Sequence, residues 1–436
     1  MLRRLQSVRL SKVVLLRISV ILGLLAGFAL SPKLWLSSRL YPLTPVWSFI
    51  SAPRSPIDYI IFFALIALLI AVSATPRRGL LIAVFTLLAL VALQDQSRWQ
   101  PWFYQYVAML LAIALAGPER QAAALNTCCL IVAATYIWSG LAKLNPGFTG
   151  GTFPWLVGPF LGAWPMAAQW LARHLAFVVP LIECGVGVGL LTRRLRTAAL
   201  FSAIAMHVFV LIVIGPLGRN FNAVVWPWNL AMIAFLLILF FRRTEEPAPQ
   251  DIIWGRGFAF QKVALILFGV MPALSSANLW DAYLSSALYA GNKNSGVVYV
   301  SDDVFDRLPE SIEDYVYEDE PDRNDLDINQ WSLGELNVPA YPEIRIYRNV
   351  ARQICGYAMD GSGVELVLHG KRALVNGNRR SIYHCSDLQR SSRELRPVEP
   401  GRGDNSQIVG WSQGVDATLA WSLLAGVSNP KVFRGR

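Results

Sequence analysis

Residues Ile57–Ala74 read IDYIIFFALIALLIAVSA, and this stretch decides the fold class. Its only charged residue is Asp58, next to its amino end. An α-helix of this length rises about 27 Å, close to the thickness of the hydrocarbon core of a bilayer. The stretch is therefore predicted to be a transmembrane helix.

Eight further stretches are similarly apolar, which predicts an all-α polytopic membrane bundle of about nine transmembrane helices. Composition agrees, because the 436 residues are 54% hydrophobic and only 16% charged, too little charge for a soluble surface. No small-residue cleavage pattern follows the first stretch, so it is interpreted as a retained span rather than a signal peptide. The eight stretches are Val13–Leu30, Gly79–Leu93, Trp102–Ala116, Ala122–Leu144, Leu175–Leu191, Ala198–Ile214, Ala223–Phe241 and Phe258–Ala277.

The distribution of basic residues predicts the orientation of the bundle. Arg77, Arg193 and Arg242 follow the second, sixth and eighth stretches, which places all three on the side of the N-terminus. Short loops rich in Lys and Arg stay in the cytoplasm. We therefore expect a multi-pass protein, of the bacterial inner membrane, with a cytoplasmic N-terminus. Residues 1–277 hold 22 Lys/Arg and 7 Asp/Glu, and the remainder holds 17 and 22, so the net charge of +10 reflects loop flanks rather than nucleic-acid binding.

After residue 277 the sequence becomes polar and predicts a small extracytoplasmic α+β domain over residues 278–390. Its expected elements are a strand, an acidic loop, a helix and a second strand, at Val297–Val300, Ser301–Asp327, Glu343–Gln353 and Val364–His369. Residues 391–436 are rich in Ser, Gly, Arg and Pro, and we expect them to be mostly disordered.

Two cysteines of this domain, Cys355 and Cys385, are predicted to form a disulfide. An extracytoplasmic compartment is oxidising, and a loop of this size is stabilised by about 3 kcal/mol when it is closed. A zinc site that adds His369 and His384 is the alternative, but the spacing lacks a paired-ligand motif. No metal site is predicted.

Two aromatic segments lie between predicted spans on the outer side, at residues 31–56 and 147–165. Aromatic side chains favour the headgroup level of a bilayer, so both segments could be interfacial anchors. They could instead form a non-helical lid over a cavity inside the bundle, because irregular backbone at that depth must be buried or line a wet cavity.

The end of the fifth predicted span, Tyr136–Pro146, reads YIWSGLAKLNP and carries the strongest candidate site. Tyr136, Gly140 and Lys143 are spaced by four and three residues, so they share one helix face. Asn145 precedes the proline and is biased away from helical backbone angles. Lys143 is either a base near the mouth of the bundle or a lysine that snorkels to the interface.

Two further ionisable residues fall inside predicted spans. Glu183 lies in the sixth span and His207 in the seventh. Such groups are costly in a bilayer and indicate a functional site. Together with Lys143 they form the predicted catalytic set, while Tyr136, Gly140 and Asn145 are predicted to contact substrate.

Residues Tyr136–Asn145 resemble the signature of the vitamin K-dependent gamma-carboxylase family and its bacterial HTTM relatives. The Gly-rich helix after Glu183, the basic turn Arg193–Arg196 and the central His207 continue this resemblance across about residues 120–241. The same region is also similar to the wider DoxX and MauE group of membrane proteins linked to quinones or redox chemistry.

The resemblance implies that Lys143 is a base that deprotonates a reduced quinone, and that the bundle binds a lipophilic, quinone-like substrate. Peptide-glutamate carboxylation is not carried over, because the outer domain is short and no segment suits capture of a propeptide. A non-catalytic membrane anchor, or a subunit of a redox or other membrane complex, is the alternative. A transporter would predict internal repeats, which are not found. Whether the chain is an enzyme stays open at this point.

Overall fold

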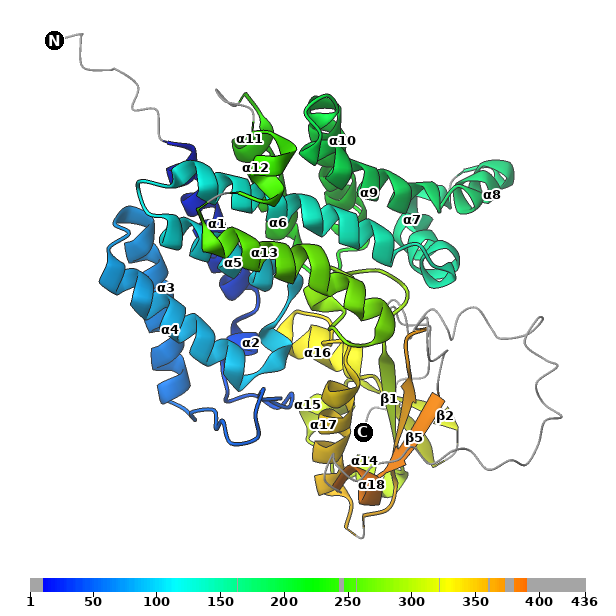
Figure 1. Cartoon of the computed structure of the whole chain (residues 1–436). Helices are drawn as coiled ribbons and strands as arrows, with labels where there is room; N and C mark the ends of the chain where they lie inside the picture. Colours follow the sequence, from blue (N-terminus) through cyan, green and yellow to red (C-terminus); the bar gives the residue numbers. More distant parts are fainter. Residues whose placement is uncertain are drawn as a thin grey trace.

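The computed structural model describes residues 11–389 except 163, 243–246, 256, 321, 360 and 373–379. The predicted disordered tail, 391–436, lies outside the described residues. A helical bundle occupies the upper part of the molecule in Figure 1, and a sheet with its own helices occupies the lower part. One apolar core runs without a break from the bundle into the sheet.

Each of the nine predicted apolar stretches consists mainly of helix. Five helical runs are long and apolar enough to cross a membrane, namely α1 (Lys12–Leu30), α3 (Ile57–Ala74), α6 (Gln121–Ala142), α10 (Arg196–Ile214) and the run Ala259–Ala277. That last run consists of α13 (Ala259–Ala264), a π-helical part (Leu265–Val270) and a 3₁₀ part (Met271–Ala277). The other four are shorter: α4 (Arg78–Gln94), α5 (Pro101–Ala116), α9 (Val178–Leu191) and α11 (Val225–Phe240). The described helices are thus compatible with a membrane protein.

Helices α6 and α9 pack closely because small residues lie between them. A Cβ atom on Gly140 would lie 2.6 Å from the backbone nitrogen of Cys184, and one on Gly187 would lie 2.5 Å from a side-chain carbon of Ile137. Glycines let two helix backbones approach each other. This contact brings the end of α6, which carries Lys143, against the helix that carries Glu183.

The expectation of non-helical backbone at residues 147–165 is wrong, although Phe148, Phe153 and Val157 of this segment do line a cavity in the bundle. The segment forms a π-helical turn, η2 (Phe148–Thr152), and helix α7 (Phe153–Leu161), followed by α8 (Met166–His174). Pro154 lies in the first turn of α7, where a missing backbone N–H costs nothing.

Residues 31–56 begin with the short helix α2 (Pro32–Trp35) and then run irregularly along the sheet domain. The backbone N–H groups of Leu40 and Tyr41 donate to the Glu335 carboxylate at 2.8 and 2.9 Å. The Tyr41 ring packs edge-on against Trp331, with ring centroids 5.1 Å apart. This segment therefore joins the bundle to the domain.

The domain contains an antiparallel five-stranded sheet in the order β2-β3-β1-β4-β5. In the central strand, Val298 pairs with Leu326 on one side and with Leu366 on the other. The strands are β1 (Ser295–Val300), β2 (Val316–Glu320), β3 (Arg323–Leu326), β4 (Val364–His369) and β5 (Arg380–His384). The predicted acidic loop at 301–327 is wrong in part, because β2 and β3 lie within it.

The helices of the domain are mostly short, and the predicted helix at Glu343–Gln353 appears one residue later as α17. Its buried residues Ile346, Val350 and Ile354 recur every four positions and face the sheet. The helical elements are η5 (Tyr283–Ser285), α14 (Asp302–Phe305), α15 (Glu310–Glu313), α16 (Ile328–Leu336), α17 (Ile344–Ile354), η6 (Cys355–Tyr357) and α18 (Cys385–Gln389).

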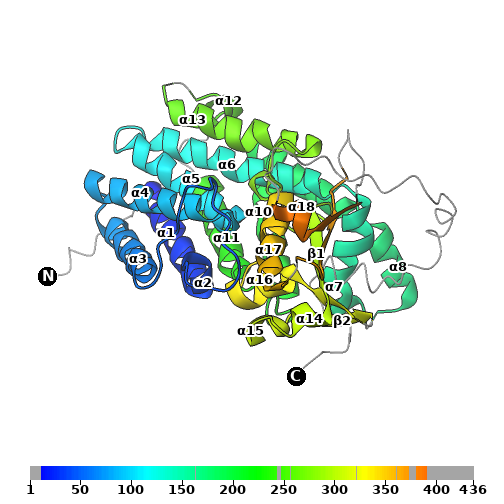
Figure 2. The same ribbon diagram turned by 90° about the horizontal axis from the view of Figure 1, so that it is seen from below.

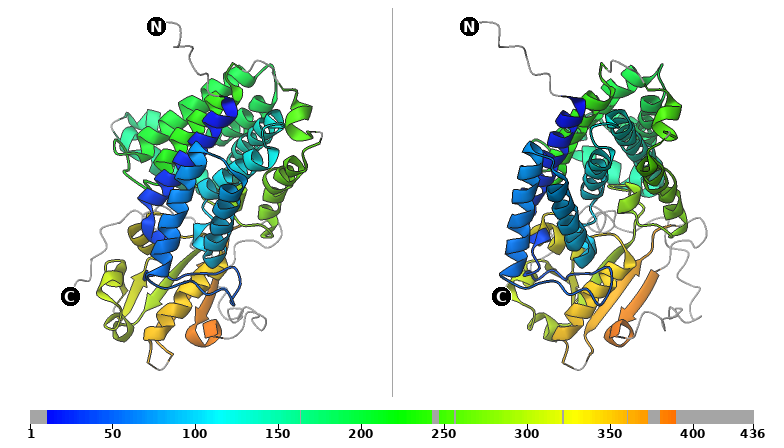
Figure 3. Two further views of the ribbon diagram at one scale, coloured as in Figure 1. Left: turned by 90° about the vertical axis from the view of Figure 1, so that its left-hand side faces the viewer. Right: turned by 60° about the vertical axis from the view of Figure 1, so that its left-hand side comes forward.

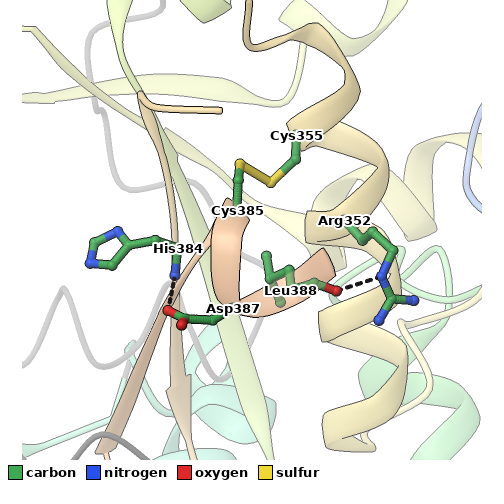
Figure 4. Close-up of a disulfide and its surroundings, with 6 residues drawn as sticks. All are labelled: Arg352, Cys355, His384, Cys385, Asp387 and Leu388. Atoms are coloured by element: carbon green, nitrogen blue, oxygen red, sulfur yellow. Dashed lines mark hydrogen bonds between the residues drawn. A yellow bond between two sulfur atoms is a disulfide. The ribbon is translucent and has the colours of Figure 1, made fainter. Parts of the chain in front are cut away.

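The predicted disulfide between Cys355 and Cys385 is confirmed, and Figure 4 shows it joining the end of α17 to the start of α18. Beside it, Arg352 donates to the backbone oxygen of Leu388 at 2.7 Å. Both sulfurs are therefore bonded to each other and are not zinc ligands.

The two ends of the bundle differ in what they contact. At the end remote from the sheet, Lys12 donates to the backbone oxygen of Phe241 at 2.8 Å, and Arg196 donates to Pro247 at 3.2 Å. At the opposite end of α1, the backbone oxygen of Leu30 accepts from Asn337 of the domain. Figures 2 and 3 show the start of α1 far from the sheet in further views.

Candidate functional site

A cavity of about 150 Å³ lies in the end of the bundle that faces the domain. Helices α6, α9, α10 and α11 form its walls, together with η2 and α7, and Leu288 and Tyr289 from the segment before β1 also border it. Most of its lining is apolar, and the polar side chains converge from different helices. Four of the six predicted site residues outside the disulfide line it: Tyr136, Lys143, Glu183 and His207.

Lys143 and Glu183 form an ion pair on the cavity wall. The Lys143 Nζ lies 3.0 and 2.9 Å from the two carboxylate oxygens, and it also donates to the Ser139 hydroxyl at 2.5 Å. The side chains are only 12% and 11% exposed. A nearly buried charge needs a partner of opposite sign, and each of the two side chains supplies one to the other.

His207 is held between two polar side chains. Its Nδ1 lies 2.7 Å from the Asn229 side-chain oxygen, and its Nε2 lies 2.5 Å from the Tyr136 hydroxyl. The Asn229 side-chain nitrogen donates to the backbone oxygen of Val225, so its oxygen accepts from Nδ1. In the neutral ring, Nε2 is then the acceptor for the Tyr136 proton. The three residues form a directed hydrogen-bond chain.

The other two predicted substrate contacts, Gly140 and Asn145, do not line the cavity among the described residues. Gly140 lies at the contact between α6 and α9, close to the backbone oxygen of Pro180. Asn145 donates to the backbone oxygens of Ala142 and Ala290 at 2.8 and 2.7 Å. It thereby ties the end of α6 to the segment that brings Leu288 and Tyr289 to the cavity.

Sequence reasoning missed Ser139, Asn229 and the two residues from the segment before β1. Asn229 could have been found, because it is the only polar amide within the apolar stretch Val224–Phe241 and such residues are costly there. Leu288 and Tyr289 gave no such signal, because only the folded arrangement brings them to the bundle.

The arrangement can exchange protons with a bound molecule. The Lys143–Glu183 pair carries no net charge and contains a donor and an acceptor in direct contact, while the Tyr136–His207 contact offers a second transferable proton. Within the described residues, no three His, Cys, Asp or Glu side chains group so that they could hold a metal ion.

The fold and the cavity thus define a helical protein with a largely apolar cavity, lined by one ion pair and one hydrogen-bonded chain, beside a disulfide-bonded sheet domain. Comparisons with protein-family models, curated proteins and solved structures find no match to this chain.

Proposed function

We propose that the chain crosses a bacterial inner membrane nine times, with its N-terminus in the cytoplasm and its sheet domain outside. Support comes from the basic residues Lys12, Arg196 and Arg242, which follow or begin helices at the end remote from the domain. The disulfide agrees with an oxidising compartment for the domain. A reporter that is active only in the cytoplasm, fused after Arg436, should give no signal, and a strong signal would contradict this topology.

Within this topology, we propose an acid–base site for a lipophilic, quinone-like substrate, with Lys143 as the base. The observation that carries the proposal is that the Lys143–Glu183 pair and the Tyr136–His207–Asn229 chain line one apolar cavity. An apolar cavity of about 150 Å³ accepts a benzene-sized ring. The resemblance to the carboxylase, HTTM and DoxX group supports the same class of substrate.

The proposed proton transfer begins within the ion pair. A proton passes from the Lys143 ammonium to the Glu183 carboxylate, which it contacts directly at 2.9 Å, and this transfer leaves a neutral amine and a neutral acid. The amine then takes the proton of a substrate hydroxyl. The O–H bond of the substrate breaks and an N–H bond forms, which leaves a substrate anion beside the Lys143 ammonium and a neutral Glu183. No charge is left unpaired.

The Tyr136–His207 contact would position the substrate. The Asn229 side chain fixes the orientation of the His207 ring, so a ligand oxygen that replaces the Tyr136 hydroxyl would meet a defined nitrogen. His207 and Tyr136 are 9% and 2% exposed, so this contact is shielded from water.

A spectroscopic titration tests the site. Purified protein in lipid nanodiscs is titrated with a reduced short-chain benzoquinone, whose neutral and anionic forms absorb at different wavelengths. We expect saturable binding and the anion spectrum at neutral pH, and we expect Lys143→Met to bind the neutral form. Lys262→Met, at an exposed lysine of α13, is the matched control. Saturable binding that never yields the anion would contradict the base, and no saturable binding would contradict the substrate class.

A second candidate function is a membrane anchor that positions the domain for a redox or other membrane-complex partner. It is favoured by the connections between bundle and domain, where Arg345 of α17 donates to the Gln96 side chain and Asn349 donates to the Leu43 oxygen at 2.9 Å. In that case, a bundle with Lys143 and His207 both replaced should still support the protein's role in cells, provided that the domain stays attached.

A further inference from the structure

A second, smaller pocket of about 20 Å³ lies beside the cavity. Leu288 and Tyr289 line both, so these two side chains form a shared wall. The remaining lining comes from the η2–α7 segment, from Phe221 before α11 and from the domain. The pocket therefore lies where bundle and domain meet.

Two polar groups of this pocket are buried donors that lack an acceptor. The Trp155 Nε1 and the Tyr283 hydroxyl are buried without a hydrogen-bond partner, and these side chains are only 6% and 1% exposed. The Asn329 oxygen accepts from the backbone of Ala340, which leaves the NH₂ group of that amide as the available end. A buried donor without an acceptor is destabilising, so two of them in one pocket indicate a ligand that accepts hydrogen bonds.

The pocket is also positively charged. Lys293 lines it, and no described residue forms an ion pair or hydrogen bond with its ammonium. Arg219 stacks on the outer part of the same wall, with its guanidinium carbon 5.1 Å from the centre of the Trp155 ring. No Asp or Glu side chain lines the pocket. A cation without a counter-ion, surrounded by donors, is the pattern of an anion-binding site.

We propose that this pocket binds a small oxyanion, of the size of formate, nitrate or acetate, between Lys293, Trp155 and Tyr283. A volume of about 20 Å³ is little more than one water molecule needs, so the pocket encloses one or two oxygens of a planar carboxylate or nitrate group and not a tetrahedral phosphate. The bound group could be a free anion or the charged end of a larger molecule that enters from the side of the domain. This inference goes beyond the proposed function, because it concerns a separate pocket and does not depend on the base.

The ionisation of the lining residues supports this site. Burial lowers the pKa of Lys293 to about 8, so the ammonium is present at neutral pH and is lost as the pH rises above this value. Burial raises the pKa values of Tyr283 and Tyr289, so both stay neutral donors over the same range. Binding of an anion should therefore weaken above about pH 8.

The test measures the thermal unfolding midpoint of the full chain in detergent while formate, nitrate, acetate or phosphate is added at constant ionic strength. We expect a saturable rise with the three small anions and none with phosphate. Butyrate distinguishes the two sources, since it should also bind if the pocket accepts the end of a larger molecule. Lys293→Met should weaken binding about tenfold or more, because a hydrogen bond to a charged group is lost.

Controls separate this site from general salt effects and from the cavity. Lys262→Met should keep the full response, and so should Lys143→Arg, which leaves the second pocket untouched. Trp155→Phe removes one donor with little change in shape, so it should weaken binding even if Lys293→Met does not fold. An equal response of wild-type protein and both pocket variants would overturn the proposal. A flat response of the wild-type protein would show that water alone satisfies these donors, and would overturn it too.

Discussion

The ion pairs Arg39–Asp95 and Lys143–Glu183 each join a basic and an acidic side chain away from water, but their surroundings differ. At the junction with the domain, Arg39 pairs with Asp95 at 2.5 Å, and both side chains are 0% exposed. The neighbouring Arg98 is equally buried and donates to three backbone oxygens at 2.7–2.9 Å, as well as to the Gln94 side chain. Each guanidinium is thus surrounded by acceptors from fixed backbone.

The Lys143–Glu183 pair has hydrogen-bonding partners on one side and the cavity on the other. Lys143 contacts Glu183 and Ser139, and the rest of its surroundings is the apolar cavity. A lysine can also give up its proton, whereas a guanidinium cannot in the usable pH range. The comparison teaches that a saturated arginine network holds parts of the fold together, while an open lysine pair beside a cavity is suited to chemistry.

The largest effect is expected at the saturated network. Arg98→Met leaves three backbone oxygens and part of the Asp95 charge unpaired in the interior, which should destabilise the fold by about 3–5 kcal/mol. The matched control is Arg54→Met, at an exposed arginine of the same outer region. Thermal unfolding in detergent, followed by size-exclusion chromatography, measures the difference. Similar midpoints for the two variants would show that the network is not a stabilising element.

The second prediction concerns how the stability of the protein depends on pH through Glu343. Burial, together with the nearby Asp281 charge, raises the pKa of Glu343 from 4.5 to about 7. Because the folded state holds this proton more tightly, the contribution of Glu343 to stability is complete below pH 4.5. It is lost as the pH rises to about 7, a total of about 3 kcal/mol. Glu343→Gln should remove this pH dependence of stability. The thermal unfolding midpoint of the variant should therefore rise relative to that of the wild-type protein between pH 5 and pH 8. A constant difference would contradict the shifted pKa.

Breaking the open pair should cost less. Glu183→Gln leaves the Lys143 ammonium with the Ser139 hydroxyl and an amide oxygen, and the cavity can admit water beside it. We expect a loss of about 1–3 kcal/mol, smaller than that of Arg98→Met. The same thermal unfolding measurement applies, with Glu365→Gln on strand β4 as the control. A loss larger than that of Arg98→Met would assign the pair to structure rather than to chemistry.

The sequence was most informative where physical constraints are local. The helix at Ile57–Ala74 has the predicted bounds, because an uninterrupted apolar run defines its own ends. Strands β2 and β3 were missed because VYEDE and RNDL carry acidic residues that hide the alternation of an edge hairpin. Asn324 and Asp325 are nevertheless buried there, and the Asn324 side chain donates to the backbone oxygen of Val300 at 3.2 Å.

The candidate site also contains residues that could be predicted from the sequence and residues whose roles could not. Lys143, Glu183 and His207 were identifiable because ionisable side chains are rare in apolar stretches, and the structure places all three on one cavity. Gly140 and Asn145 were expected to contact substrate, but their roles in helix packing and in holding Ala290 depend on which segments meet. Sequence spacing reports which residues share a helix face, and it does not report what that face meets.

The most direct test of the central claim, that Lys143 is a base in a substrate cavity, is the rate at which a bound reduced quinone loses its proton. This rate is measured by stopped-flow absorbance in wild-type protein, in Lys143→Arg and in the control Lys262→Arg. Arginine keeps the charge and the pairing with Glu183, so Lys143→Arg should fold and bind normally, but it should react about 10²–10⁴-fold more slowly. An unchanged rate in Lys143→Arg would contradict the account and leave Lys143 as a structural anchor.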